Sequence, residues 1–158
     1  QINQESKGKV IIAGDTYKLN FLDAIQLFDG KNIYTIVPEN EEITLIKPTD
    51  DDEDFMFNPT KILSFYKEGY DYHWDISQKI KGKNIQFIKL IPTVNDSDIK
   101  SILIGIDTSE YHVYKIIEVG FNGTITTLTI NNMEINKIIP SNFFVFDPSD
   151  YPNYYINE

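Results

Sequence analysis

The sequence predicts a mainly β protein with a small helical part, an all-β or α+β fold, and three observations support this prediction. Short segments of apolar residues are separated by the turn dipeptides Asp29-Gly30 and Asn122-Gly123. Aromatic residues form 13% of the chain, and they favour strands. Only residues 58–66 have the features of a helix. A length of 158 residues suits one domain, so we expect a single domain over residues 1–158.

The N-terminal third is predicted to form consecutive antiparallel strands. Residues 8–21 read as one or two strands, a further strand precedes the turn at Asp29-Gly30, and another follows it. Residues 38–42 read as a second turn, after which the next strand begins. The apolar residues of these strands are Tyr17, Leu19, Phe21, Ile25, Leu27, Ile33, Tyr34, Ile36 and Val37. The strand after the turn carries apolar residues on both faces, whereas a strand with one solvent-exposed face alternates apolar and polar residues. Something must therefore cover its second face.

Residues 58–66 are predicted to form a short helix. Asn58 is a favourable N-cap, and Pro59 occupies the first helical position, where its missing N–H costs nothing. Ile62, Phe65 and Tyr66 lie at helical spacing and form one apolar face. The acidic run at residues 50–54 precedes this helix and does not match a calcium-binding loop, since Phe55 stands where that loop needs glycine. After Gly69 the strands return, and the segment from residue 138 is irregular.

The residues contain no motif for catalysis, so we expect no enzyme, no cofactor and no metal. The chain has no Cys, which excludes thiolate catalysis and cysteine-based zinc sites. It has no G-x-S-x-G nucleophile motif, no P-loop and no dinucleotide-binding motif. His73 and His112 lie in strand patterns beside aromatic residues, and we interpret them as structural.

The charge balance also excludes classes of partner. The formal net charge is −10, and all fourteen basic residues are Lys. Nucleic-acid binding requires a basic face, and anionic lipid attracts basic segments, so we expect neither kind of binding. What remains is apolar surface. Two interpretations stay open at this point: a fully packed barrel or sandwich, and a curved sheet with an apolar cavity that admits an acyl chain.

The order of several short motifs resembles the outer-membrane lipoprotein carrier proteins of the bacterial periplasm. These motifs are G-x-x-x-x-x-G-D-x-Y-K-L at 8–19, L-F-D-G-K-N-I-Y at 27–34, P-x-x-x-E-I at 38–43, N-P-T-K-I-L-S-F-Y at 58–66, K-L-I-P at 89–92, G-I-D-x-x-x-Y at 105–111 and P-S-N-F-F-V-F-D-P-S-D-Y-P at 140–152. None is specific alone. Together they follow one order over nearly the whole chain.

The resemblance implies a curved antiparallel sheet that forms an unclosed β-barrel, with a helical lid over a hydrophobic cavity. It implies a periplasmic, monomeric carrier that receives acylated lipoproteins from an inner-membrane lipoprotein-releasing transporter and passes them to an outer-membrane acceptor. The implied cavity residues are Tyr17, Leu19, Phe21, Ile25, Leu27, Tyr34 and Ile36. The implied lid residues are Ile62, Leu63, Phe65 and Tyr66.

The sequence departs from this family in two ways. The chain starts after the signal peptide, first helix and first strand of family members, so we expect an N-terminally truncated domain. Family carriers also have an Arg before the strand at 17–21 that ties barrel to lid, whereas the residues here are AGDTYK. The alternative hypothesis is a periplasmic sensor or envelope scaffold of the same fold that binds a protein or lipid partner.

Overall fold

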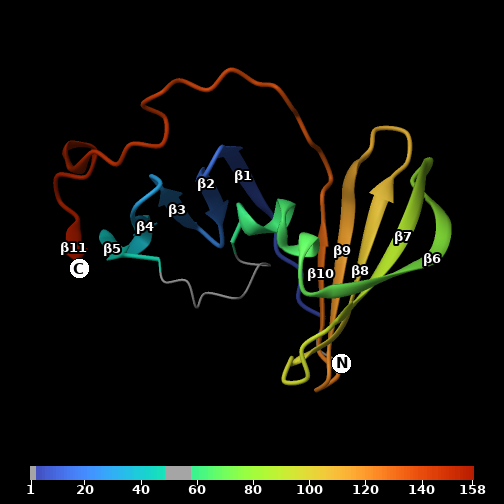
Figure 1. Cartoon of the computed structure of the whole chain (residues 1–158). Coiled ribbons are helices and arrows are strands. Elements are labelled where there is room, and N and C mark those ends of the chain that lie inside the picture. The colour runs from blue at the N-terminus through green and yellow to red at the C-terminus, as the bar shows by residue number, and fades with distance from the viewer. Residues whose placement is uncertain (1–2, 49–57) are drawn as a thin grey trace. The chain divides into compact units, whose positions relative to one another are not determined.

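The computed structural model describes residues 3–48 and 58–158, and the chain forms two compact units (Figure 1). The first contains residues Gln1–Ser64 together with Lys137–Glu158, and the second contains Phe65–Asn136. Each unit is built on one sheet, so the predicted mainly β class is confirmed. The prediction of a single carrier-like domain stays a prediction.

The first unit contains a six-stranded sheet in the order β1-β2-β3-β4-β5-β11. Its strands are β1 (Gly8–Ala13), β2 (Thr16–Phe21), β3 (Ala24–Phe28), β4 (Ile33–Val37), β5 (Glu42–Ile46) and β11 (Tyr155–Asn157). The first five pair antiparallel with their neighbours in sequence, and β11 pairs parallel with β5. The 3₁₀ helix η1 (Pro38–Asn40) connects β4 to β5.

The turns of this sheet follow local chemistry. In the predicted Asp29-Gly30 turn, Asp29 Oδ1 accepts hydrogen bonds from the backbone N–H groups of Lys31 (2.8 Å) and Asn32 (2.7 Å). Gly30 has φ +96°, a conformation that glycine adopts without strain. The turn between β2 and β3 consists of only Leu22 and Asp23, both with positive φ.

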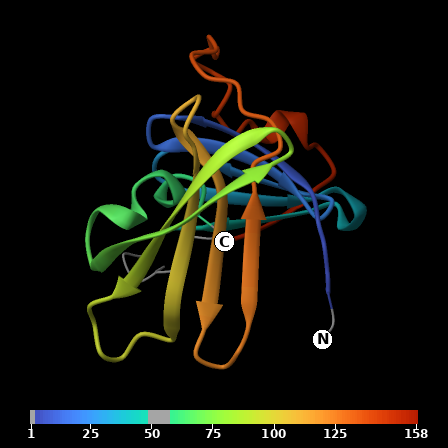
Figure 2. The ribbon, with the colours of Figure 1, turned by 90° about the vertical axis from the view of Figure 1, so that its right-hand side faces the viewer.

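The second unit contains a five-stranded antiparallel sheet in the order β10-β9-β8-β7-β6 (Figure 2). Its strands are β6 (Tyr70–Ile80), β7 (Lys83–Pro92), β8 (Ile99–Asp107), β9 (His112–Gly120) and β10 (Ile125–Thr129). The predicted turn at Asn122-Gly123 connects β9 to β10 and is confirmed, and turns at residues 81–82 and 108–111 connect β6 to β7 and β8 to β9. A core cluster of Ile85, Phe87 and Tyr114 packs with Leu103 and Ile117.

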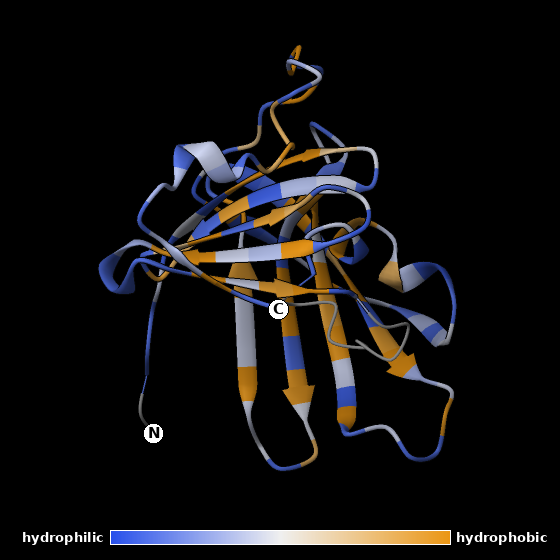
Figure 3. Ribbon diagram, turned by 90° about the vertical axis from the view of Figure 1, so that its left-hand side faces the viewer, coloured by the Kyte–Doolittle hydropathy of each residue, from blue (hydrophilic) through white to orange (hydrophobic). Residues whose placement is uncertain are grey.

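The sequence was right about an open β architecture and wrong about one continuous curved sheet. Neither sheet closes on itself among the described residues, and the strands divide between two sheets. Apolar and polar residues alternate along many of the strands (Figure 3). Such alternation allows one face of a sheet to pack while the other meets a different environment.

The predicted α-helix at residues 58–66 is replaced by two 3₁₀ helices, η3 (Lys61–Leu63) and η4 (Phe65–Lys67). Asn58 does act as a cap, since its Oδ1 accepts from the Thr60 N–H at 3.1 Å. Ser64 then leaves helical geometry at φ −141°. A helix this short is marginal without strong packing, so the tighter turns prevail. The described residues contain no α-helix, and a helical lid is not confirmed. The acidic run at 50–54 lies outside them.

Candidate functional site

The seven predicted cavity residues lie in neighbouring strands but on opposite faces of the six-stranded sheet. Residues directly opposite each other in an antiparallel pair share a face. Lys18 faces Leu27, and Leu27 faces Tyr34, so the pairing of β2, β3 and β4 fixes which residues belong together. One face carries Tyr17, Leu19 and Phe21. The other carries Ile25, Leu27, Tyr34 and Ile36.

The first face is a packed one near Tyr17. Its side chain is buried, and its hydroxyl donates a hydrogen bond to Gln26 Oε1 at 2.7 Å. The Tyr17 ring lies 5.7 Å from that of Phe28, at a tilt of 43°. Leu19 and Phe21 are half-buried. A buried tyrosine with a satisfied hydroxyl is typical of a packed structural position.

The second face is covered by the C-terminal segment of residues 140–154, which we call the C-terminal strap. Ile36 on β4 is 1% exposed and Leu27 on β3 is 6% exposed. Both are buried although the described part of this unit has no second sheet to pack on them. Ile43 on β5 faces Ile36 and is also buried. The strap therefore supplies the cover that the apolar pattern of β4 requires within the first unit.

Aromatic rings of the strap lie on this face. The Phe146 ring stacks on Tyr34 with centroids 4.2 Å apart and an interplanar angle of 15°. Tyr151 stacks on Phe146 at 5.7 Å, and Tyr154 meets Tyr151 edge to face at 5.1 Å. The Lys18 Nζ lies 5.3 Å from the centroid of the Phe143 ring, within the range of a cation–π contact.

A pocket of about 150 Å³ remains between the strap and the sheet. The sheet contributes Lys18, Ile25, Leu27 and Ile36 to its lining, and the strap contributes Asn142, Phe143, Val145, Phe146, Asp147, Asp150 and Tyr151. Apolar side chains from both sides thus meet carboxylates and one ammonium group. A more open pocket of about 360 Å³ adjoins the strap at Thr16, Asp29, Lys31, Ser141, Phe144, Val145 and Phe146.

The polar groups of the strap have partners that set their protonation. Hydrogen bonds from the Ser149 hydroxyl and from its backbone N–H lower the pKa of Asp147. Burial raises the pKa of the Tyr151 phenol, and the nearby Asp150 charge raises it further. Near neutral pH the strap therefore presents an ionised Asp147 carboxylate and a neutral Tyr151 phenol.

The predicted lid residues do not form one element. Ile62 and Leu63 belong to η3 in the first unit, whereas Phe65 and Tyr66 belong to η4 in the second. Phe65 packs edge to face against Tyr66 at 5.9 Å and Tyr70 at 6.0 Å. Their role as a lid stays a prediction. Within residues 3–48 and 58–158, no helix has the length and apolar character to cross a membrane.

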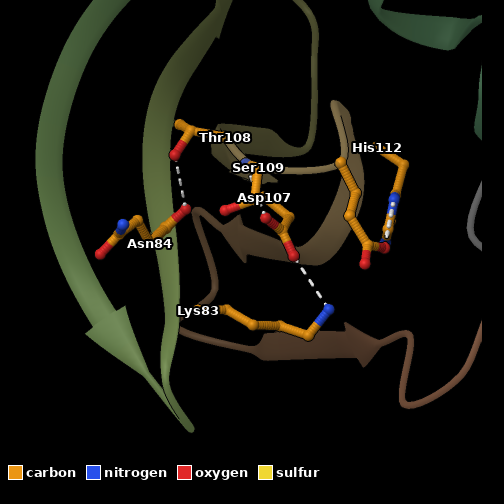
Figure 4. A network of polar contacts seen from close by, with 7 residues as sticks. Lys83, Asn84, Asp107, Thr108, Ser109 and His112 are labelled. Atoms are coloured by element: carbon orange, nitrogen blue, oxygen red, sulfur yellow. Dashed lines mark hydrogen bonds and ion pairs between the residues drawn. The ribbon is translucent and has the colours of Figure 1, made fainter.

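A second cluster of functional groups lies in the turn between β8 and β9 (Figure 4). Potential ligand atoms of Asp107, Glu110 and His112 lie within 4.8 Å of one another. However, Asp107 Oδ2 accepts from Lys83 Nζ at 2.9 Å, and Asp107 Oδ1 accepts from the Ser109 N–H at 2.9 Å. Both carboxylate oxygens are therefore engaged by the chain itself, and we interpret the cluster as turn-stabilising.

Sequence reasoning missed the residues that the strap brings to the site. These are Phe143, Phe146 and Tyr151, together with Lys18 on β2. The available signal was the density of aromatic residues in the irregular stretch 143–155, which has no strand or helix period. Such a stretch must bury its rings against another element, because exposed aromatic clusters are rare in monomeric proteins.

Comparisons with known proteins found relatives in structure alone. No family model and no curated protein matches the sequence. An uncharacterized conserved protein from Thermus thermophilus matches with a TM-score of 0.58 at 6% identity, over 90% of this chain and 76% of that one. At that identity the likeness shows a shared fold.

Two further solved structures bear names from the group that the sequence resembles. A putative outer membrane lipoprotein-sorting protein domain from Vibrio parahaemolyticus matches at 19% identity over 84% of this chain, with a TM-score of 0.45. A LolA superfamily protein from Nitrosomonas europaea matches at 12% identity over 82% of this chain, with a TM-score of 0.42. This chain spans 65% and 62% of their lengths.

Proposed function

We propose that this chain is a periplasmic carrier that binds the acyl chains of lipoproteins. It would receive them from an inner-membrane lipoprotein-releasing transporter and pass them to an outer-membrane acceptor. One observation carries the proposal: Ile25, Leu27 and Ile36 form an apolar sheet face covered by a strap, with a pocket between the two. The order of the sequence motifs supports lipoproteins as the cargo.

An apolar face of this kind suits an acyl chain in energy and in shape. Each methylene group removed from water contributes about 0.8 kcal/mol, so a chain of several carbons gains affinity without any specific polar contact. A cavity of about 150 Å³ is enough for one benzene-sized group. With the strap in place the exposed surface of the pocket is mainly polar, so the pocket admits at most the end of an acyl chain, while Lys18, Asp147 and Asp150 can meet its polar portion.

The function is tested by asking whether the protein carries and releases lipid. Protein purified without detergent is extracted with organic solvent, and the extract is analysed by mass spectrometry. In parallel, the protein is incubated with inner-membrane vesicles that hold the transporter, acylated lipoprotein and ATP. We expect acyl-chain lipid in the extract and lipoprotein released into the soluble fraction. Absence of both would contradict the carrier function and favour the sensor or scaffold alternative.

A pair of variants links the result to the site. Ile25→Glu places a carboxylate on the face that lines the pocket, and lipid binding should be lost because burying that charge is costly. Ile125→Glu makes the same change on β10, where the side chain is 55% exposed, and should bind lipid as the unaltered protein does. Circular dichroism establishes that both variants are folded. Equal lipid binding by the two variants would place the lipid elsewhere.

A further inference from the structure

The C-terminal strap is held on the sheet by side chains and not by backbone hydrogen bonds to it. The backbone hydrogen bonds of the described strap residues close within the strap. Phe143 N–H donates to Pro140 O, Val145 N–H to Asn142 O, Asp150 N–H to Asp147 O, Tyr151 N–H to Pro148 O and Tyr154 N–H to Tyr151 O. The side chain of Asp147 likewise bonds locally, to Ser149. The strap can therefore leave the sheet with its own hydrogen bonds intact.

What fastens the strap is a small set of ring contacts. Phe146 stacks on Tyr34, Phe143 meets the Lys18 ammonium, and Phe144 is buried. The rings of Phe143 and Phe146 line the same pocket as Leu27 and Ile36. They occupy the surface that an apolar ligand would need.

The strap is tethered where β11 begins. The Tyr155 N–H donates to Glu41 O at 2.8 Å, and residues 155–157 pair with Glu42, Ile43 and Thr44 of β5. These backbone hydrogen bonds hold the end of the strap at β5 independently of the ring contacts. A strap released from the sheet would thus stay attached and able to return.

We propose that the C-terminal strap is a displaceable cover. The acyl chain of an amphiphile binds by replacing the strap's aromatic rings on the face of the six-stranded sheet, while β11 stays paired with β5. The ligand class rests on the proposed function. The displacement rests on the strap itself.

The size of the pocket supports displacement over simple filling. With the strap in place the pocket holds about 150 Å³, whereas sites that enclose drug-sized ligands have about 300–1,000 Å³. The rings of Phe143 and Phe146 line this pocket, so moving them both enlarges the space and uncovers Leu27. The larger pocket of about 360 Å³ beside the strap is not lined by Leu27 or Ile36, so a fixed strap would leave only the end of a chain in contact with these residues.

The first test compares affinities for a dansyl-labelled fatty acid followed by fluorescence. If the strap competes with the ligand, the apparent affinity equals the intrinsic affinity multiplied by the fraction of molecules in which the strap is open. Phe146→Ala removes the ring on Tyr34 and should tighten binding about three- to tenfold, since the loss of one stacked aromatic pair shifts an equilibrium by that order. Phe143→Ala should act in the same direction. A weaker or unchanged affinity in both variants would show a fixed wall and overturn the proposal.

Phe121→Ala is the matched control, because Phe121 is 71% exposed and belongs to the second unit. Its affinity for the dansyl-labelled fatty acid should equal that of the unaltered protein. Any general effect of removing a phenylalanine on folding or solubility would appear in this variant too. Tightening by all three variants would overturn the assignment to the strap.

The second test measures amide hydrogen exchange with and without lauric acid. Without ligand, the strap amides of Phe143, Val145 and Tyr151 should exchange together and faster than those of β3 and β4. With saturating lauric acid, strap protection should fall while β11 keeps its protection. Strap amides as protected as β3 would overturn the proposal.

The two tests separate the strap from the function. If neither fatty acid binds, the carrier function fails. Amide hydrogen exchange of the strap without ligand, which should be faster in Phe146→Ala than in the unaltered protein, still decides whether the strap opens.

Discussion

Leu22 shows how a single residue can store strain in an exposed turn. It closes the β2–β3 hairpin with Asp23 at φ 49° and 59°, a conformation that costs residues other than glycine and asparagine free energy. Its side chain is 65% exposed, so little burial offsets that cost.

We expect Leu22→Asn to raise the free energy of unfolding by about 1 kcal/mol, because asparagine tolerates the left-handed region. Urea denaturation with an unchanged m-value measures the gain. Val94→Asn is the control, since Val94 is equally exposed but does not have positive φ. A Leu22 variant no more stable than this control would contradict the prediction.

Gly105 is required for a different reason, the close approach of its neighbours. A Cβ atom built on Gly105 would lie 2.8 Å from Ile85 Cγ2 and 2.8 Å from Phe87 Cε1. Both neighbours are buried in the core of the second unit and have little room to move.

Gly105→Ala should therefore lower the free energy of unfolding by about 1–3 kcal/mol, the usual cost of overpacking. Thermal and urea unfolding measure the loss. Thr127→Ala, at an exposed position of β10, should change stability by no more than about 0.5 kcal/mol. A neutral Gly105 variant would show that this core relaxes easily.

The Lys83–Asp107 pair should make stability depend on pH. The hydrogen bond from Lys83 lowers the pKa of Asp107, and the same bond raises the pKa of Lys83. A lowered carboxyl pKa adds stability above its ordinary value of 3.8, which is lost as pH falls through the folded-state pKa. A raised ammonium pKa adds stability below its ordinary value of 10.5, which is lost as pH rises through the folded-state pKa.

Asp107→Asn should accordingly lower the urea midpoint at neutral pH, and the deficit should shrink in acid. The measurement is the midpoint between pH 2 and pH 8, with the exposed Asp96→Asn as control. A deficit that stays constant down to the lowest pH would show that packing, and not charge, explains the loss.

At the scale of the element, strands were predictable and faces were not. Alternating residues and the turns at Asp29-Gly30 and Asn122-Gly123 identify most strands, because these signals are local. The face that a strand turns to its neighbours depends on turn length, since a shift of one residue reverses every side chain. The turn at Leu22-Asp23 lacks the usual glycine or asparagine, and so the split between Leu19 and Leu27 could not be inferred.

The remaining errors are also errors of context. The helix expected after Asn58 had a favourable cap, but a segment of nine residues is too short to form a stable α-helix without strong packing. The strap has no period, so its position over Ile36 is set entirely by tertiary contacts. Its aromatic residues were visible in the sequence, and their target was not.

Alanine substitutions on the two faces should separate the candidate site from the rest of the sheet. Leu27→Ala should cost about 2–3 kcal/mol in stability, at the lower end for buried leucine because a pocket already adjoins it. It should also weaken binding of a dansyl-labelled fatty acid.

Leu19→Ala provides the comparison, because Leu19 lies on the opposite face and outside the pocket lining. It should leave fatty-acid affinity unchanged. Urea denaturation and a fluorescence titration measure both quantities. Loss of binding in Leu19→Ala alone would place the ligand on the face of Tyr17, Leu19 and Phe21, which carries three of the seven implied cavity residues.

At the scale of the whole molecule, net charge should keep the protein off membranes that hold no cargo. The formal charge of −10 repels anionic lipid, and a carrier must leave the membrane after each transfer. We expect no binding to anionic vesicles without lipoprotein in sedimentation assays at low and high salt. Binding at low salt that disappears with added salt would contradict this expectation.

The first unit is made from two stretches of chain, with the whole second unit between them. A ribosome therefore releases β2 to β5 first, then the complete five-stranded sheet, and only afterwards the strap. At roughly 5–20 residues per second, the faces of Leu27 and Ile36 wait on the order of ten seconds for their cover. During that interval the nascent chain exposes this apolar face to solvent. A holding chaperone that binds apolar segments would find its target there, before the strap is in place.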